Sequence, residues 1–316
     1  MEEPELKITL DEMIRINDVV RDAVGEQEAI YLPPYYFSES GCAKRLLRLM
    51  AYGKKKSENI EEILKKVVSY INKEKDMILI ATIATEYPEK SFKNYEKAFK
   101  SLGVKNIEKL DIKCRADAYV DENINLVKKC SVLFFTGGDQ LRITSILGGT
   151  PINEAIKSLC KSKASIVGTS AGASVMSDTM IIEGKDDESP RKCTLKMSPG
   201  LGLVKNIMID QHFAQRGRLG RLLTGIAQNP EVLGIGIDED TAIIVSDEGI
   251  AEVVGSGAVY FVDGSSIRYS NVSEQYSNEV LSMFNVKLHV LKEGNKFNLL
   301  KKAPLEEDKN FYENDK

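Results

Sequence analysis

The sequence of 316 residues has few histidines and no paired cysteine motif. Its only histidines are His212 and His289, and neither lies near a cysteine cluster, so we expect no metal site and no cofactor. The five cysteines are odd in number and none are spaced as C-x-x-C, which in a long chain indicates reduced thiols and not a disulfide framework. They are Cys42, Cys114, Cys130, Cys160 and Cys193.

Charge and hydropathy exclude two further classes of protein. The net charge is -4, without the basic excess typical of nucleic-acid binding. The acidic start at residues 1–5 has no apolar segment after it of the kind found in a secretory signal. No window reaches the roughly 18 apolar residues of a membrane-spanning helix. We therefore expect a cytoplasmic protein that binds neither nucleic acid nor membrane.

Short apolar runs alternate with helical patterns from residue 77 onward, which predicts βαβ units and a largely parallel sheet. In such α/β folds the functional sites lie at the carboxyl ends of the strands. The runs read as strands are 77–81, 132–135, 165–168, 207–209, 232–237, 242–245 and 258–262, and helices are expected over 95–102, 152–160 and 218–227.

The ends of the chain differ from this pattern. Residues 1–75 form an atypical segment, expected to pack on the same domain, with helical apolar spacing over 10–24 and 60–71. A catalytic domain is expected over 76–305, followed by a polar tail at 306–316.

The segment 168–173, Gly-Thr-Ser-Ala-Gly-Ala, follows an apolar strand and precedes a helix. It matches G-x-S-x-G, in which small residues permit a sharp turn that lifts a nucleophilic serine, here Ser170, above the sheet. The N–H group of Ala171 would then stabilise an oxyanion, together with backbone near Gly138. The alternatives are a glycine-rich packing turn or a phosphate cradle.

A base is expected at His212, which follows the apolar run 207–209 just as the elbow follows its own strand. The alternative is an ordinary hydrogen-bonded loop histidine. A triad also needs a carboxylate that holds the imidazole tautomer. The residues alone leave this choice open among Glu183, Asp186, Asp187, Glu188 and Asp210.

Three arginines follow the histidine within a few positions, at Arg216, Arg218 and Arg221. The last two are three residues apart on one helix face. Arginines beside a base suit bidentate capture of substrate carboxylates, and Arg191 is a further candidate. The alternative is a solvated helix start, although cations there oppose the helix dipole.

Four blocks together resemble the cyanophycinase family of serine peptidases, family S51. They are FFTGGDQ at 134–140, GTSAGASVM at 168–176, DQHFAQRGRLGRL at 210–222 and GIGIDE at 234–239. The match covers about residues 76–263, and the third block is the most specific. The G-G-A-E-D motif that opens related chains has no counterpart here, where the corresponding region is 45–56.

The resemblance implies an α/β fold of the flavodoxin-like or class I glutamine amidotransferase-like kind, in a dimer. It implies exopeptidase release of β-Asp-Arg dipeptides from cyanophycin, a polyaspartate chain that carries arginine on each side-chain carboxyl. It assigns Ser170 as nucleophile, His212 as base and Glu188, by its spacing from Ser170, as the triad carboxylate. The residues that it implies for substrate binding are Gln140, Asp210, Gln211, Arg216, Arg218 and Arg221, with Asp210 as the acid that receives the substrate arginine.

Two rival functions use the same residues. An aspartyl dipeptidase of this family would also need cations for a carboxylate substrate. A non-catalytic carboxylate-binding protein would keep the pocket, but the intact Ser170 and His212 argue against it. A thiol mechanism is disfavoured because the elbow carries serine where that chemistry needs cysteine.

Overall fold

The computed structural model describes residues 20–24, 27–31, 62–162, 164–186, 188–191, 195–274 and 279–305. The chain divides into two units, Met1–Glu58 and Asn59–Lys316. In the first, β1 (Val20–Val24) pairs antiparallel with β2 (Gln27–Tyr31). The helical spacing expected over 10–24 is thus wrong for 20–24, and the rest of it lies outside the described residues, as do 45–56 and the tail at 306–316.

The second unit contains a parallel four-stranded sheet in the order β4-β3-β5-β6. Its strands are β3 (Met77–Ala81), β4 (Asn106–Leu110), β5 (Val132–Phe135) and β6 (Ser165–Gly168). Side chains alternate between its faces with period two. Ile78 and Phe134 therefore belong to one hydrophobic cluster, and Leu79 and Phe135 to another.

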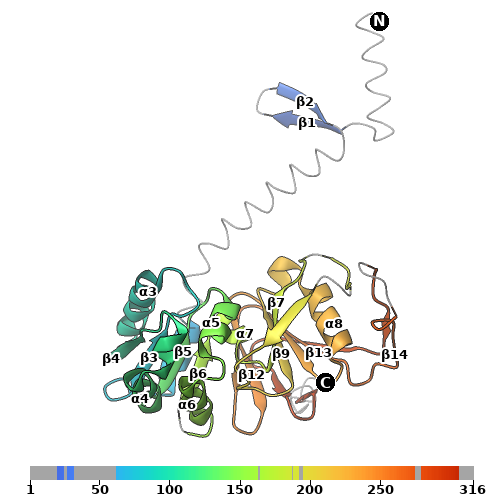
Figure 1. Cartoon of the computed structure of the whole chain (residues 1–316). Helices are drawn as coiled ribbons and strands as arrows, with labels where there is room; N and C mark the ends of the chain where they lie inside the picture. Colours follow the sequence, from blue (N-terminus) through green and yellow to red (C-terminus); the bar gives the residue numbers. More distant parts are fainter. Residues whose placement is uncertain are drawn as a thin grey trace, which may run out of the picture. The chain divides into compact units, whose positions relative to one another are not determined.

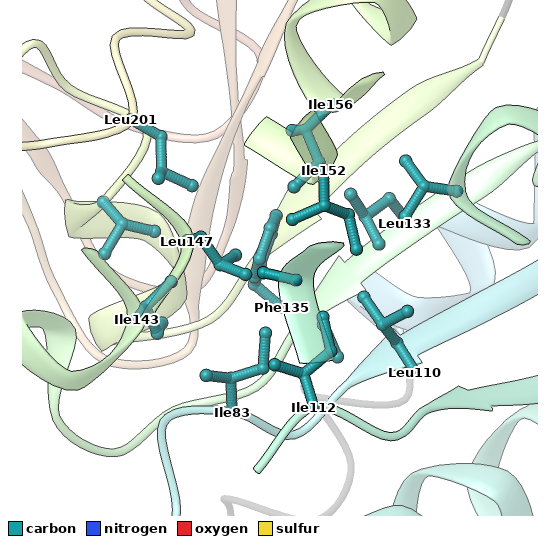
Figure 2. Close-up of a cluster of buried hydrophobic side chains, with 14 of the residues drawn as sticks. Ile83, Leu110, Ile112, Leu133, Phe135, Ile143, Leu147, Ile152, Ile156 and Leu201 are labelled. Atoms are coloured by element: carbon teal, nitrogen blue, oxygen red, sulfur yellow. The ribbon is translucent and has the colours of Figure 1, made fainter. Parts of the chain in front are cut away.

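Helices cover both faces of this sheet (Figure 1). The helix over 62–69 and α3 (Pro88–Ser101) pack on one face through Leu64, Val68 and Phe99. The other face carries α4 (Asp121–Lys129), α5 (Gln140–Leu147) and α6 (Pro151–Leu159). Figure 2 shows this second cluster, in which Phe135 lies among aliphatic side chains of α5 and α6.

A second four-stranded sheet, in the order β16-β13-β10-β9, carries the other half of the site. It consists of β9 (Ile207–Gln211), β10 (Leu233–Ile237), β13 (Val259–Asp263) and β16 (Lys287–Leu291). Only the β9–β10 pair is parallel, and it aligns Gln211 with Ile237. The helix α8 (Leu219–Gln228) packs on this sheet through Leu222 and Ile226.

The remaining elements complete the unit. A further sheet has the order β11-β12-β17-β18, from β11 (Thr241–Val245), β12 (Ile250–Gly255), β17 (Lys296–Asn298) and β18 (Ala303–Pro304). Two hairpins pair β7 (Thr179–Glu183) with β8 (Lys196–Pro199), and β14 (Tyr269–Ser270) with β15 (Met283–Phe284). Short helical turns are α7 (Ala171–Ser174), η1 (Arg115–Tyr119) and η3 (Ala214–Arg216).

The predicted α/β architecture with a parallel central sheet is confirmed, and each predicted strand overlaps an observed one. The chain around β13 and β16 is antiparallel, so the parallel part is confined to two groups of strands. Within the described residues, no helix is both long and apolar enough to cross a bilayer.

Candidate active site

Ser170 stands at the carboxyl end of β6, on a sharp turn into α7. Its backbone has φ 53° and ψ −114°, a conformation that L-residues rarely adopt. The turn depends on close backbone contact. A Cβ added to Gly168 would lie 2.2 Å from the carbonyl oxygen of Gly172, so the small residue is required there. The serine is thereby lifted clear of the sheet, as a nucleophile elbow requires.

His212 follows β9 and has a left-handed φ of 53°. The next residue anchors this turn, because Phe213 is buried and donates its N–H to the Ile237 carbonyl at 3.1 Å. The Phe213 ring fills the space beside Gly236, where an added Cβ would lie 2.5 Å from the ring. As a result, His212 Nε2 lies 3.0 Å from Ser170 Oγ.

The other ring nitrogen, His212 Nδ1, lies 2.9 Å from Glu239 Oε1. A carboxylate only accepts hydrogen bonds, so Nδ1 carries the proton and Nε2 is left to accept the Ser170 hydroxyl proton. Glu188 does not hold this position, in contrast to the expectation from sequence. Its carboxylate lies 3.3 Å from Lys185 Nζ and 4.0 Å from Arg191 Nε, while its backbone packs against Gly220.

The surroundings of His212 set its protonation state. Burial lowers the pKa of His212 below its ordinary value of 6.5. The hydrogen bond to Glu239 raises this pKa, and the positive charge of Arg216 lowers it again. The imidazole is therefore neutral at pH 7, as a base that accepts a serine proton must be.

Two backbone donors near Ser170 have no hydrogen-bond partner among the described residues, the N–H groups of Gly138 and Ala171. Gly138 has φ 147°, and a Cβ there would lie 2.2 Å from the Ala84 carbonyl oxygen. Only glycine fits this approach of the two strand ends. Unpaired N–H groups beside a nucleophile are suited to stabilising an oxyanion.

Comparison with known proteins identifies the family of the chain. The model of "Peptidase family S51" matches residues 47–253. The cyanophycinase of Geminocystis herdmanii is 36% identical over 230 residues, which are 72% of this chain and 85% of that protein. The cyanophycinase of Trichormus variabilis is 36% identical over 77% of this chain and 82% of its own length. The chain belongs to peptidase family S51.

The fold agrees with a solved structure of the same class. A peptidase from an acI-B1 Actinobacterium has a TM-score of 0.55 and 21% identity, over 76% of this chain and 91% of the other. Because the chain belongs to family S51, it is a serine peptidase. Within the described residues, no group of three or more His, Cys, Asp or Glu side chains is arranged to hold a metal ion.

Arginines and acids of this S51 chain form a buried ion-pair cluster behind the histidine. Asp210 is fully buried, and Arg221 binds it through two nitrogens, Nε at 2.7 Å and Nη2. Arg218 Nη1 lies 3.4 Å from Asp210 Oδ1 and donates to the Gln211 carbonyl at 2.7 Å. Asp210 is therefore not open to a ligand, which corrects its expected role as a direct acceptor of substrate arginine.

The same two arginines, Arg218 and Arg221, also pair with Asp186, which is partly exposed at the surface. Its Oδ1 accepts from Arg218 Nε at 3.0 Å and lies 3.4 Å from Arg221 Nη1, and its side chain is 40% exposed. Arg216, at the end of η3, is exposed, and its guanidinium has no hydrogen-bond partner among the described residues. Of the three arginines that follow His212, Arg216 is the one left open to a ligand.

Each of the two glutamines of the predicted pocket has one end of its side-chain amide held by a hydrogen bond. Gln140 begins α5 and donates through Nε2 to the Ile181 carbonyl at 2.9 Å. Gln211 Oε1 accepts from the buried Ser174 hydroxyl at 3.1 Å. Each carboxamide is therefore held at one end, and its other end has no hydrogen-bond partner in the part of the chain that the structure describes.

Sequence reasoning missed Glu239, although the segment 234–239 was part of the family resemblance. A signal was present, because an acidic pair follows the buried strand β10 directly. Since β10 runs parallel to β9 and aligns Ile237 with Gln211, residues just past both ends meet at one edge. The strand order that makes this inference possible is not visible in the sequence.

Proposed function

We propose that this S51 peptidase hydrolyses cyanophycin and releases β-Asp-Arg dipeptides, with Ser170, His212 and Glu239 as its catalytic triad. The observation that carries the proposal is a pair of hydrogen bonds to the His212 ring. Ser170 Oγ lies 3.0 Å from Nε2, and Glu239 Oε1 lies 2.9 Å from Nδ1. The substrate is supported by the cyanophycinases that are 36% identical over most of the chain.

The reaction is acyl transfer. His212 Nε2 takes the proton of Ser170 as Oγ forms a bond to the scissile carbonyl carbon. The oxyanion accepts hydrogen bonds from the N–H groups of Gly138 and Ala171. The carbon–nitrogen bond then breaks, and His212 returns its proton to the leaving amine. Water attacks the acyl-enzyme, gives a proton to His212, and the released Ser170 oxygen takes that proton back.

Substrate recognition rests on groups that remain open. Arg216 is exposed and suited to an aspartyl carboxylate, while the fixed carboxamides of Gln140 and Gln211 supply further hydrogen bonds. Arg218 and Arg221 are paired with the buried Asp210, so they support this surface and do not contact the substrate directly. Asp186 pairs with Arg218 and Arg221, but its side chain is 40% exposed, so it takes over the acidic role expected of Asp210 and receives the guanidinium of the substrate arginine.

The test is incubation with purified cyanophycin and mass analysis of the products. Wild type should release a β-Asp-Arg dipeptide, and Ser170→Ala should release none while keeping its unfolding midpoint. Ser158→Ala is the matched control, because that hydroxyl lies on α6 and bonds only its own helix at Glu154. Full activity in Ser170→Ala would rule out the mechanism.

Two other outcomes separate the rival functions. Hydrolysis of Asp-X dipeptides without release from the polymer would assign the chain as an aspartyl dipeptidase. No turnover, together with no labelling of Ser170 by a serine-directed phosphonate, would assign a carboxylate-binding protein.

We further propose a cytoplasmic homodimer. Free thiols at Cys114, Cys130 and Cys160 fit a reducing compartment. Exposed apolar side chains on the edge strand β16, Leu288 and Val290, fit a surface that a second copy covers. Light scattering after size-exclusion chromatography measures the mass, and a monomer at all concentrations would contradict the dimer.

A further inference from the structure

The two turns that carry His212 and Glu239 are joined by hydrogen bonds that do not involve the imidazole. Asp238 Oδ1 accepts from the Ala214 N–H at 2.9 Å, two residues past the histidine. Gln215 Oε1 accepts from the Glu239 N–H at 3.0 Å. Each turn thus lends one side chain to the backbone of the other, and we call these two contacts the Asp238–Gln215 clip.

Asp238 also ties in a third segment. Its Oδ2 accepts from the Ala258 N–H at 3.1 Å, and its own N–H donates to the Ala258 carbonyl at 3.2 Å. The residue is 9% exposed, so both carboxylate oxygens act in a largely dry site. The two N–H donors approach different oxygens of one side chain, and a carboxylate satisfies both because each of its oxygens accepts hydrogen bonds.

The Asp238–Gln215 clip holds the strained turn that carries His212. His212 holds a left-handed φ of 53°, a strained conformation that persists only where neighbouring structure over-determines it. Without a fixed turn, Nδ1 would drift away from Glu239 and Nε2 from Ser170. A displacement of about 1 Å in such a constellation can lower a rate about 100-fold.

We propose that Asp238 is a positioning residue that, with Gln215, sets the His212 ring between Ser170 and Glu239. The proposal rests on the proposed function for its catalytic consequence, but its geometric part concerns only the histidine. In this proposal the Asp238 carboxylate touches no reacting atom and acts only by binding the backbone N–H groups of Ala214 and Ala258.

The first experiment observes the His212 ring directly by proton NMR. The chain has only two histidines, so the Nδ1 proton bonded to Glu239 can be assigned by comparison with Glu239→Gln. In Asp238→Asn, one carboxylate oxygen becomes an amide that faces an N–H donor. We expect the His212 Nδ1 proton signal to broaden or disappear through exchange with water.

Asp263→Asn is the matched control. Asp263 is also buried and accepts hydrogen bonds, from Ser265 N at 3.0 Å and Ser265 Oγ at 2.8 Å. It pairs with Leu233 at the start of β10, the end opposite His212. A merely structural effect would lower the unfolding midpoint in both variants and leave the Nδ1 signal intact in both.

The second experiment measures turnover of cyanophycin. We expect Asp238→Asn to lower kcat about 10- to 100-fold with KM nearly unchanged, and Asp263→Asn to alter neither. If Asp238→Asn does not fold, Gln215→Met removes the other half of the clip from an exposed position and should weaken the same signal. An unchanged Nδ1 signal in a folded Asp238→Asn or Gln215→Met protein would overturn the proposal.

The two proposals can fail separately. If wild type lacks turnover but its Nδ1 signal responds to Asp238→Asn, the proposed function fails and the positioning role stands. If Ser170→Ala abolishes turnover while Asp238→Asn leaves both signal and kcat unchanged, the positioning role fails alone.

Discussion

Glu239 Oε1 holds His212 Nδ1 at 2.9 Å, on the side of the ring opposite Ser170. The two residues come from the ends of neighbouring parallel strands and are 27 positions apart in the chain. Their contact is partly shielded, with 26% of the His212 side chain and 19% of the Glu239 side chain exposed. This pairing decides which ring nitrogen is available to act as a base.

Glu239→Gln should therefore disable the enzyme while preserving its fold. An amide can donate to Nδ1 and stabilise the wrong tautomer, and the same kind of change in other triads lowers kcat by on the order of 10⁴-fold. We expect a loss of about 10³- to 10⁴-fold in kcat on cyanophycin. Glu188→Gln is the control and should stay near wild type, because its partners are the surface side chains Lys185 and Arg191. Equal losses in both variants would contradict the assignment of Glu239.

The pH dependence of kcat/KM should report the free imidazole. Burial holds the pKa of His212 below 6.5, and only the neutral ring accepts the Ser170 proton. We expect kcat/KM to be level at neutral pH and to fall with a midpoint below pH 6.5 as the pH decreases. A midpoint clearly above 6.5 would show that the Glu239 contact outweighs burial.

Arg216→Gln should move this midpoint upward. The Arg216 charge lowers the pKa of His212, so its removal makes protonation easier and shifts the acidic limb to higher pH. The midpoint, and not the absolute rate, is the quantity to compare, because Arg216 is also proposed to bind substrate. Lys161→Gln, at an exposed position two residues past the end of α6, is the control that should leave the midpoint in place. A midpoint that Arg216→Gln does not move would remove Arg216 from the electrostatics of the base.

The sequence predicts the elements that are buried on both faces. Runs such as Met77–Ala81 and Val132–Phe135 are uninterrupted apolar segments, and they form β3 and β5. The edge strand β4 was missed, because Asn106–Leu110 mixes polar and apolar residues and is only partly buried. Partial burial weakens the hydrophobic pattern on which such predictions depend.

The site divides in the same way. Ser170 and His212 could be predicted because a short motif and a strand end mark each of them. The pairing of Asp210 with Arg221 could not, since sequence does not reveal that the acid is fully buried and the guanidinium turns toward it. Glu239 was missed because strand order, and not spacing along the chain, brings it to His212.

The Asp210–Arg221 pair yields a stability prediction. Removing one partner of a buried ion pair leaves an uncompensated charge and costs about 3–5 kcal/mol. Arg221→Met should lower the free energy of unfolding by about this amount in urea titrations, less whatever Arg218 compensates at 3.4 Å. The double variant Asp210→Asn with Arg221→Met should recover part of the loss. Lys100→Met, which breaks only an exposed pair with Glu96, should cost about 0.5 kcal/mol or less.

Gly168→Ala tests the elbow without touching a catalytic side chain. The added methyl group would meet the Gly172 carbonyl oxygen at 2.2 Å, and this neighbour is backbone, so the turn itself must shift. We expect a loss of about 1–3 kcal/mol in the free energy of unfolding and, in the folded protein, a fall in kcat larger than any rise in KM. Gly294→Ala provides the comparison, because it has φ +83° but no atom within 4 Å of its added Cβ. That variant should cost about 1–2 kcal/mol from its left-handed backbone and leave kcat unchanged. If Gly168→Ala is as active as Gly294→Ala, the close approach of β6 and α7 does not set the position of Ser170.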